Sequence, residues 1–177
     1  MDKNICGEVK QQVKRRIIIS ICAAVFIFGI IGILNRTPTV TIGVVTLAEG
    51  TEERELEGYE ISTLRNGEKT SAEEEPDIKS LAAQLTSVEQ EVMKNNSNNT
   101  VRVNTNMSVA FAGKYVDDVT YAVYTIDGEE ISKPAAQLSL PTKDIDSCVV
   151  RIDVKWGRTK NYKEYYYFFR VDYDKEV

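Results

Sequence analysis

The chain lacks the residues that most enzymes use for acid–base or nucleophilic chemistry. Its 177 residues include no histidine, the usual partner of a serine or cysteine nucleophile and a common zinc ligand. No glycine motif that cradles phosphate is present. Three carboxylate pairs lack the spacing of a calcium loop: Asp117/Asp118, Asp144/Asp146 and Asp172/Asp174. The sequence therefore predicts a non-catalytic protein without cofactor or metal.

The three cysteines do not form a disulfide framework. Cys6 and Cys22 fall in the first 34 residues, and Cys148 lies alone in the remainder. Cys148 is at an inward position of an expected strand, where a thiol behaves as a small apolar side chain. An unpaired cysteine outside the cytoplasm fits a host that does not cross-link its exported domains, such as a Gram-positive bacterium.

An uninterrupted apolar segment near the start predicts a membrane anchor. Residues 17–34, "IIISICAAVFIFGIIGIL", contain no charge and would span about 27 Å as a helix, close to the roughly 30 Å of a hydrocarbon core. Three bases directly precede the segment and only Arg36 follows it. This bias places residues 1–16, the basic tail, in the cytoplasm. No small-x-small cleavage motif follows, so we expect an uncleaved signal anchor and a single-pass protein of the cell membrane.

Beyond the anchor, negative charge is concentrated in one segment. The formal net charge of the chain is −5, and residues 49–77 hold eleven acids against three bases. The rest of the outer part is nearly neutral, without the basic stripe that nucleic-acid binding requires. Residues 35–77 are predicted to form an extracytoplasmic stalk with strands at 39–47 and 56–64 and an acidic spacer.

The next segment predicts an amphipathic helix at residues 78–95. Apolar side chains recur at steps of three and four, the spacing of one helix face. The same spacing is a two-heptad coiled-coil seam, so a homodimer stays open beside packing on the chain's own domain. The residues concerned are Ile78, Leu81, Leu85, Val88 and Val92.

Residues 100–177 alternate between apolar and polar side chains, which predicts an antiparallel β domain. Strands are expected near 100–111, 119–126, 136–140, 148–156 and 164–173, with Asn66-Gly67 and Asp127-Gly128 as hairpin turns. The inward positions of the 148–156 strand are Cys148, Val150, Ile152, Val154 and Trp156.

Five consecutive aromatics, residues 165–169, occupy both faces of the last strand. Tyr165, Tyr167 and Phe169 share the core face, and Tyr166 and Phe168 lie on the other. Burying such side chains stabilises a fold by about 1.5–3 kcal/mol each, so something is expected to cover them. The cover is either the helix of this chain or a partner protein.

The turn "WGRTKNYKE" forms a second candidate surface. It carries three bases and a tyrosine at a loop tip, where binding residues often collect. A partner protein, an anionic wall polymer or plain solvent would each suit them: Arg158, Lys160, Tyr162 and Lys163.

The stretch "LSLPTKDIDSCVVRIDVKWGRTKNYKEYYYFFRVDY" resembles the closing half of the Ig-like or fibronectin-type sandwiches of bacterial surface proteins. The resemblance covers about residues 100–173, and the preceding helix departs from it. The fold class expected is mainly β: one transmembrane helix and a small antiparallel Ig-like β-sandwich with one amphipathic helix. An α+β fold with a helix on a curved sheet, as in cystatin-like or NTF2-like domains, stays open.

These features predict an interaction protein. The first reading is a membrane-anchored extracytoplasmic protein–protein interaction module, a non-catalytic subunit of an envelope or membrane complex. The alternatives are a module that binds cell-wall polymer or glycan and a self-associating structural anchor. Both the Ig-like fold and the α+β fold are compatible with all three of these functions.

Overall fold

The computed structural model describes residue 26 and residues 39–72, 74–95, 100–103, 107–141 and 145–174. The chain divides into two compact units, Met1–Pro38 and Thr39–Val177. Phe26 is the described residue of the first unit; it is helical and 70% exposed. No helix within the described residues is long and apolar enough to cross a membrane. The predicted anchor and cytoplasmic tail lie, apart from Phe26, outside those residues.

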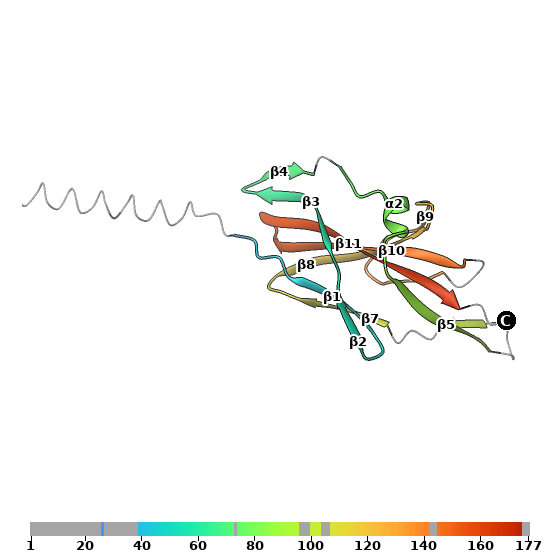
Figure 1. Cartoon of the computed structure of the whole chain (residues 1–177). Coiled ribbons are helices and arrows are strands. Elements are labelled where there is room, and N and C mark those ends of the chain that lie inside the picture. Colours follow the sequence, from blue (N-terminus) through green and yellow to red (C-terminus); the bar gives the residue numbers. More distant parts are fainter. Residues whose placement is uncertain are drawn as a thin grey trace, which may run out of the picture. The chain divides into compact units, whose positions relative to one another are not determined.

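The second unit is mainly β, as predicted, and contains two sheets (Figure 1). The small sheet is antiparallel, in the order β2 (Glu52–Glu55), β1 (Val44–Glu49), β7 (Met107–Ala112). The large sheet has the antiparallel order β4 (Glu68–Ser71), β3 (Gly58–Arg65), β11 (Asn161–Asp174), β10 (Ser147–Arg158), β8 (Val116–Thr125), β9 (Glu130–Ala135). β5 (Ser87–Asn95) pairs in parallel with β11, and β6 (Thr100–Val103) pairs with β5.

The inner faces of the two sheets share one hydrophobic core. Val45 and Leu47 of β1 belong to the same buried cluster as Ile152 of β10 and Phe169 of β11. Strict alternation along β10 produces this packing, because every second side chain points to the same face. The prediction for β10 is confirmed: its inward residues are at most 1% exposed, namely Cys148, Val150, Ile152, Val154 and Trp156.

Trp156 closes one end of this core. Its indole Nε1 donates a hydrogen bond to the Tyr167 hydroxyl at 3.0 Å. Two glycines make room for the ring: a Cβ on Gly43 would lie 2.4 Å from the indole Cζ3, and one on Gly113 would lie 2.7 Å from it. Glycine is therefore required on both sides of the indole.

Only the first turn and a half of the helix predicted at residues 78–95 forms. The prediction is wrong for the rest of that segment. Helix α2 spans Ile78–Ala82, with Asp77 as its N-cap accepting from the Ser80 amide at 3.2 Å. The chain then turns, and β5 extends from Ser87 along β11. Thr86, Ser87 and Val88 are poor helix formers. As a strand, this segment satisfies the backbone of β11 and places Val88 in the core at 0% exposure.

Several boundaries also differ from the sequence expectation. The strand expected at 39–47 begins at Val44, the strand expected at 100–111 is divided into β6 and β7, and residues 136–140 form no strand. The expected stalk is part of the domain, since residues 44–71 supply β1 to β4. Both hairpin turns are confirmed, with φ of 53° and 88° at Asn66 and Gly67 and 91° at Gly128.

Candidate functional site

The outer face of the large sheet carries Tyr166 and Phe168, the first candidate partner surface. Phe168 is only 3% exposed and packs with Ala82 and Val149. Its ring centroid lies 5.7 Å from that of Tyr59 in an edge-on arrangement. Residues of α2 and the following turn complete the cluster: Ile78, Leu81 and Leu85. The chain therefore covers Phe168 itself, and this side chain is not available to a partner.

Tyr166 is half-buried and belongs to a charged stack beside Phe168. The Arg151 guanidinium carbon lies 4.3 Å from the Tyr166 ring centroid and 5.3 Å from that of Tyr124. Arg151 also donates two hydrogen bonds to Asp153, at 2.6 and 3.0 Å. Burial raises the pKa of the Asp153 carboxyl, and the bonds from Arg151 oppose that effect. The charges of Arg151 and Asp153 are thus paired within the chain. Contact of the half-buried Tyr166 with a partner stays a prediction.

An open hollow of about 210 Å³ borders this stack. Three of its four charged side chains, those of Asp153, Lys155 and Glu164, are engaged within the chain. Glu164 accepts from the Ser62 hydroxyl and lies 3.2 Å from the Lys69 ammonium. Lys155 lies 4.2 Å from the Tyr162 ring centroid. The described residues include no cluster of metal-ligating side chains. The absence of a cofactor, a metal and an enzymatic activity stays a prediction.

The three carboxylate pairs that lack calcium-loop spacing have different surroundings. Asp118 lines the hollow, and Asp172 accepts a hydrogen bond from Arg170 at 2.8 Å. Asp144 lies outside the described residues.

The residues proposed for self-association do not form one seam. Ile78, Leu81 and Leu85 pack on the cluster around Phe168, whereas Val88 lies in the core between the sheets. Val92 is part of β5, and its side chain lies outside the described set. A coiled coil through residues 78–92 is therefore incompatible with the structure, because these positions belong to a short helix and a strand.

The side chains at the tip of the β10–β11 hairpin lie on different faces of the sheet. Arg158 lies 4.1 Å above the Tyr115 ring, and Lys160 is exposed. Lys163 is on the opposite face from Tyr162 and donates to Glu60 at 2.6 Å. This bond, aided by those from Thr63 and Tyr165, lowers the pKa of Glu60 to about 2, although burial opposes the shift. The four residues do not form a single binding patch.

Cys148 is confirmed as a core residue. Its side chain is 0% exposed, with the sulfur 3.8 Å from the Tyr173 hydroxyl. Burial raises the pKa of the thiol to about 11. A thiol held protonated and shielded from water is unreactive.

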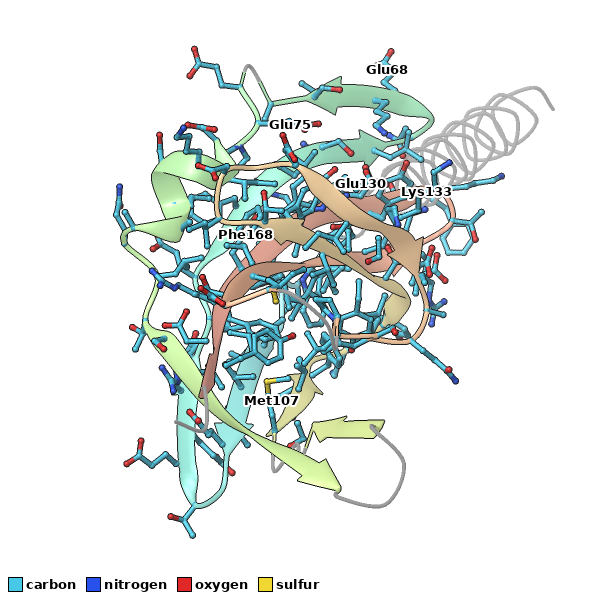
Figure 2. All side chains as sticks on the ribbon, turned by 90° about the vertical axis from the view of Figure 1, so that its right-hand side faces the viewer. Glu68, Glu75, Met107, Glu130, Lys133 and Phe168 are labelled. Carbon is cyan, nitrogen blue, oxygen red and sulfur yellow. The ribbon has the colours of Figure 1, made fainter. Side chains whose placement is uncertain are left out.

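The open edge of β7 is a site that sequence reasoning missed. β7 is the last strand of the small sheet, and no described strand pairs with its second edge. Its sequence, MSVAFA, contains neither charge nor proline. The other outermost strands carry charges, and β9 also has a proline: Glu52, Glu53 and Glu55 on β2, Glu68 and Lys69 on β4, Arg102 on β6, and Glu130, Lys133 and Pro134 on β9. Glu68, Glu130 and Lys133 are labelled in Figure 2.

The core is also incompletely covered at β7. The inner side chains of neighbouring β1, Val45 and Leu47, are at most 1% exposed. The inner side chains of β7 are only half-buried: Met107, Val109 and Phe111. The small sheet therefore ends where its apolar side chains still face solvent. The sequence signal that could have revealed this open edge is a strand whose outward residues are small and uncharged: Ser108, Ala110 and Ala112.

No protein-family model, no curated protein and no solved structure matches this chain.

Proposed function

We propose that this chain is a membrane-anchored, non-catalytic protein–protein interaction module that binds an extended strand of a partner along β7. The observation that carries the proposal is the contrast between β7 and the charged or proline-containing outer strands β2, β4 and β9. Natural sheets protect edge strands against pairing with other chains. An edge left without charge, proline or a paired strand is suited to accept one.

Strand addition defines the chemistry of the partner. Main-chain hydrogen bonds supply affinity, and alternate side chains supply specificity. The added strand would place apolar side chains beside Met107, Val109 and Phe111, where they complete the core. Its outward positions would be small, opposite Ser108 and Ala110. The partner segment is thus extended and uncharged, with apolar residues at every second position.

The order of the large sheet supports an Ig-like sandwich as the finer description of the fold. β9, β8, β10 and β11 follow one another as C′, C, F and G do in variable-type Ig domains, and β1 pairs with β7 as A pairs with B. In that family strand B also pairs with strand E on its other side. Residues 136–146 lie between β9 and β10, and their described part contains no strand. Leu138, Leu140 and Ile145 of this segment pack on the core without forming a strand. An added strand would lie beside β7, in the position that E has in that family.

The location of the module rests on the sequence. The apolar segment at 17–34 and the bases before it support a single-pass anchor with the β domain outside the cytoplasm. The unpaired Cys148 supports a Gram-positive cell surface. Lys163 pairs with Glu60 on a different face from Tyr162, so the four residues of the hairpin tip do not form the single patch proposed for wall polymer or glycan.

Photo-crosslinking in living cells tests strand addition. A photo-reactive amino acid replaces Ala110, which is exposed on β7, and in a control it replaces Lys133, which is exposed on β9. We expect a band of higher mass from position 110 and none from position 133. A band at the mass of two chains would instead indicate pairing between copies. No adduct at position 110, with folded protein present, would refute the proposal.

Membrane topology is tested separately with a membrane-impermeant maleimide on intact cells. Thr70 lies on β4 and is exposed, so a Thr70→Cys variant should react. The native Cys6 should react only after the cells are opened. Failure of position 70 to react in intact cells would contradict display outside the cytoplasm.

A further inference from the structure

The two ends of the β domain differ in charge. One end is here called the basic end. It consists of residues 39–43, 66–67, 113–115 and 158–160. These segments lie together because Val44 pairs with Ala112, and because Asn161 pairs with both Arg158 and Arg65. These residues include three bases and no acid: Lys114, Arg158 and Lys160. The flanking residues Arg65, Glu68 and Asp117 add one base and two acids. In Figure 1 the β3–β4 and β10–β11 turns lie at the left side of the domain.

The turn between β1 and β2, here called the acidic end, lies away from the basic end, because β1 runs six residues from Val44 to Glu49. Residues 49–53 include three acids and no base: Glu49, Glu52 and Glu53. Glu49 pairs with Arg54 of β2 at 2.8 Å.

The basic end also exposes apolar and aromatic side chains. Tyr115 is 56% exposed, Ile42 is 40% exposed and Val44 is 38% exposed. Tyr115 has a left-handed φ of 63°, unusual for a bulky residue, and its carbonyl accepts a hydrogen bond from Gly157 at 2.8 Å. The Arg158 guanidinium rests on its ring at 4.1 Å. An outward tyrosine beside bases is typical of the membrane–water interface.

Chain length limits the distance between this end and the apolar segment. Five residue steps separate Leu34 from Thr39, where the β domain begins. A fully extended chain covers about 3.3–3.6 Å per residue, so Thr39 lies within about 17 Å of the hydrocarbon boundary if 17–34 spans the membrane. The headgroup layer occupies roughly 5–8 Å of that distance. The acidic end has no such constraint.

We infer that the basic end of the domain rests on the anionic lipid surface of the membrane that anchors the chain. Lys114, Arg158 and Lys160 lie against phosphate-bearing headgroups, and Tyr115 enters the interfacial layer. Attraction of such bases to anionic lipids acts within about a Debye length, so the short linker is needed for it. The inference rests on the proposed function, because it requires the anchor.

Depth-dependent quenching on the full-length chain tests this contact. A Cys6→Ala/Cys22→Ala chain carries a single labelled cysteine, Thr159→Cys at the basic end or Thr51→Cys at the acidic end, both exposed positions. Each is reconstituted in vesicles of phosphatidylcholine, with or without phosphatidylglycerol, that contain a lipid spin-labelled on its headgroup. Cys148 is buried and stays unlabelled.

We expect the label at position 159 to be quenched, more so with phosphatidylglycerol, and the label at position 51 to be unquenched. A Lys114→Glu/Lys160→Glu variant should lower quenching at 159 to the level of position 51, while Trp156 emission confirms that it is folded. Equal quenching at both positions, or none at 159, in chains that survive an alkaline carbonate wash would overturn the lipid contact alone. Loss of the chain in the wash would overturn the anchor, and the inference with it.

Discussion

Replacement of Phe168 distinguishes a core residue from an interface residue. The side chain is 3% exposed and contacts Ala82 and Val149. Removal of a buried phenylalanine costs about 3–5 kcal/mol, the sum of lost transfer free energy and the cavity left behind. A hollow of about 170 Å³ already adjoins this ring, so water can enter the new space. We therefore expect the lower end, about 3 kcal/mol, for Phe168→Ala.

Unfolding of the full-length chain in detergent, followed by the fluorescence of its single tryptophan, measures this cost. Trp156 is 0% exposed, so its emission shifts to the red on unfolding. A loss of about 3 kcal/mol would lower the melting temperature by roughly 10 °C for a domain of this size. Ile126→Ala is the control, because Ile126 is 41% exposed. A cost below about 0.5 kcal/mol for Phe168→Ala would refute the packing described for α2.

Two further changes test other contacts. Gly113→Ala should destabilise the domain by about 1–3 kcal/mol in the same unfolding assay, because the new Cβ would lie 2.7 Å from the Trp156 ring and 2.8 Å from the Gly43 Cα; an unchanged midpoint would contradict this packing. Lys163→Ala should raise the pKa of Glu60 from about 2 toward 4.5, measured by NMR titration of its carboxyl group. Because the folded-state pKa is lowered, the stabilisation by this pair is present above about pH 4.5 and lost as the pH falls toward 2. A Glu60 titration that is the same in both proteins would show that the bond from Lys163 does not form in solution.

The parts of the fold that the sequence predicted are those with a local signal. The alternation from Cys148 to Trp156 has the period of a strand, and it fixes which face is buried once a second sheet covers it. Asn66-Gly67 and Asp127-Gly128 predict tight turns because their backbones adopt positive φ at low cost. The burial of Phe168 by the chain's own residues was one of the two covers expected from its position on the outer face.

The missed parts depend on pairing between segments distant in the sequence. β2 and β4 have polar residues on both faces, so no apolar period marks them, and they form because β1 and β3 offer edges to pair with. Residues 78–92 have a helical spacing of apolar side chains, yet β11 is long enough to pair with both β3 and β5. Tertiary hydrogen bonding therefore overrides the local period after Ala82.

By itself, the sequence determined the mainly β class and the core face of β10, and it contains no histidine. It also carries the apolar segment that predicts an anchor. The tertiary structure alone decided which aromatics are covered, that the basic side chains of one hairpin lie on different faces, and that β7 ends its sheet unpaired. The physical reason is that periodicity is a property of neighbouring residues, whereas the cover of a face or an edge depends on segments that only folding brings together.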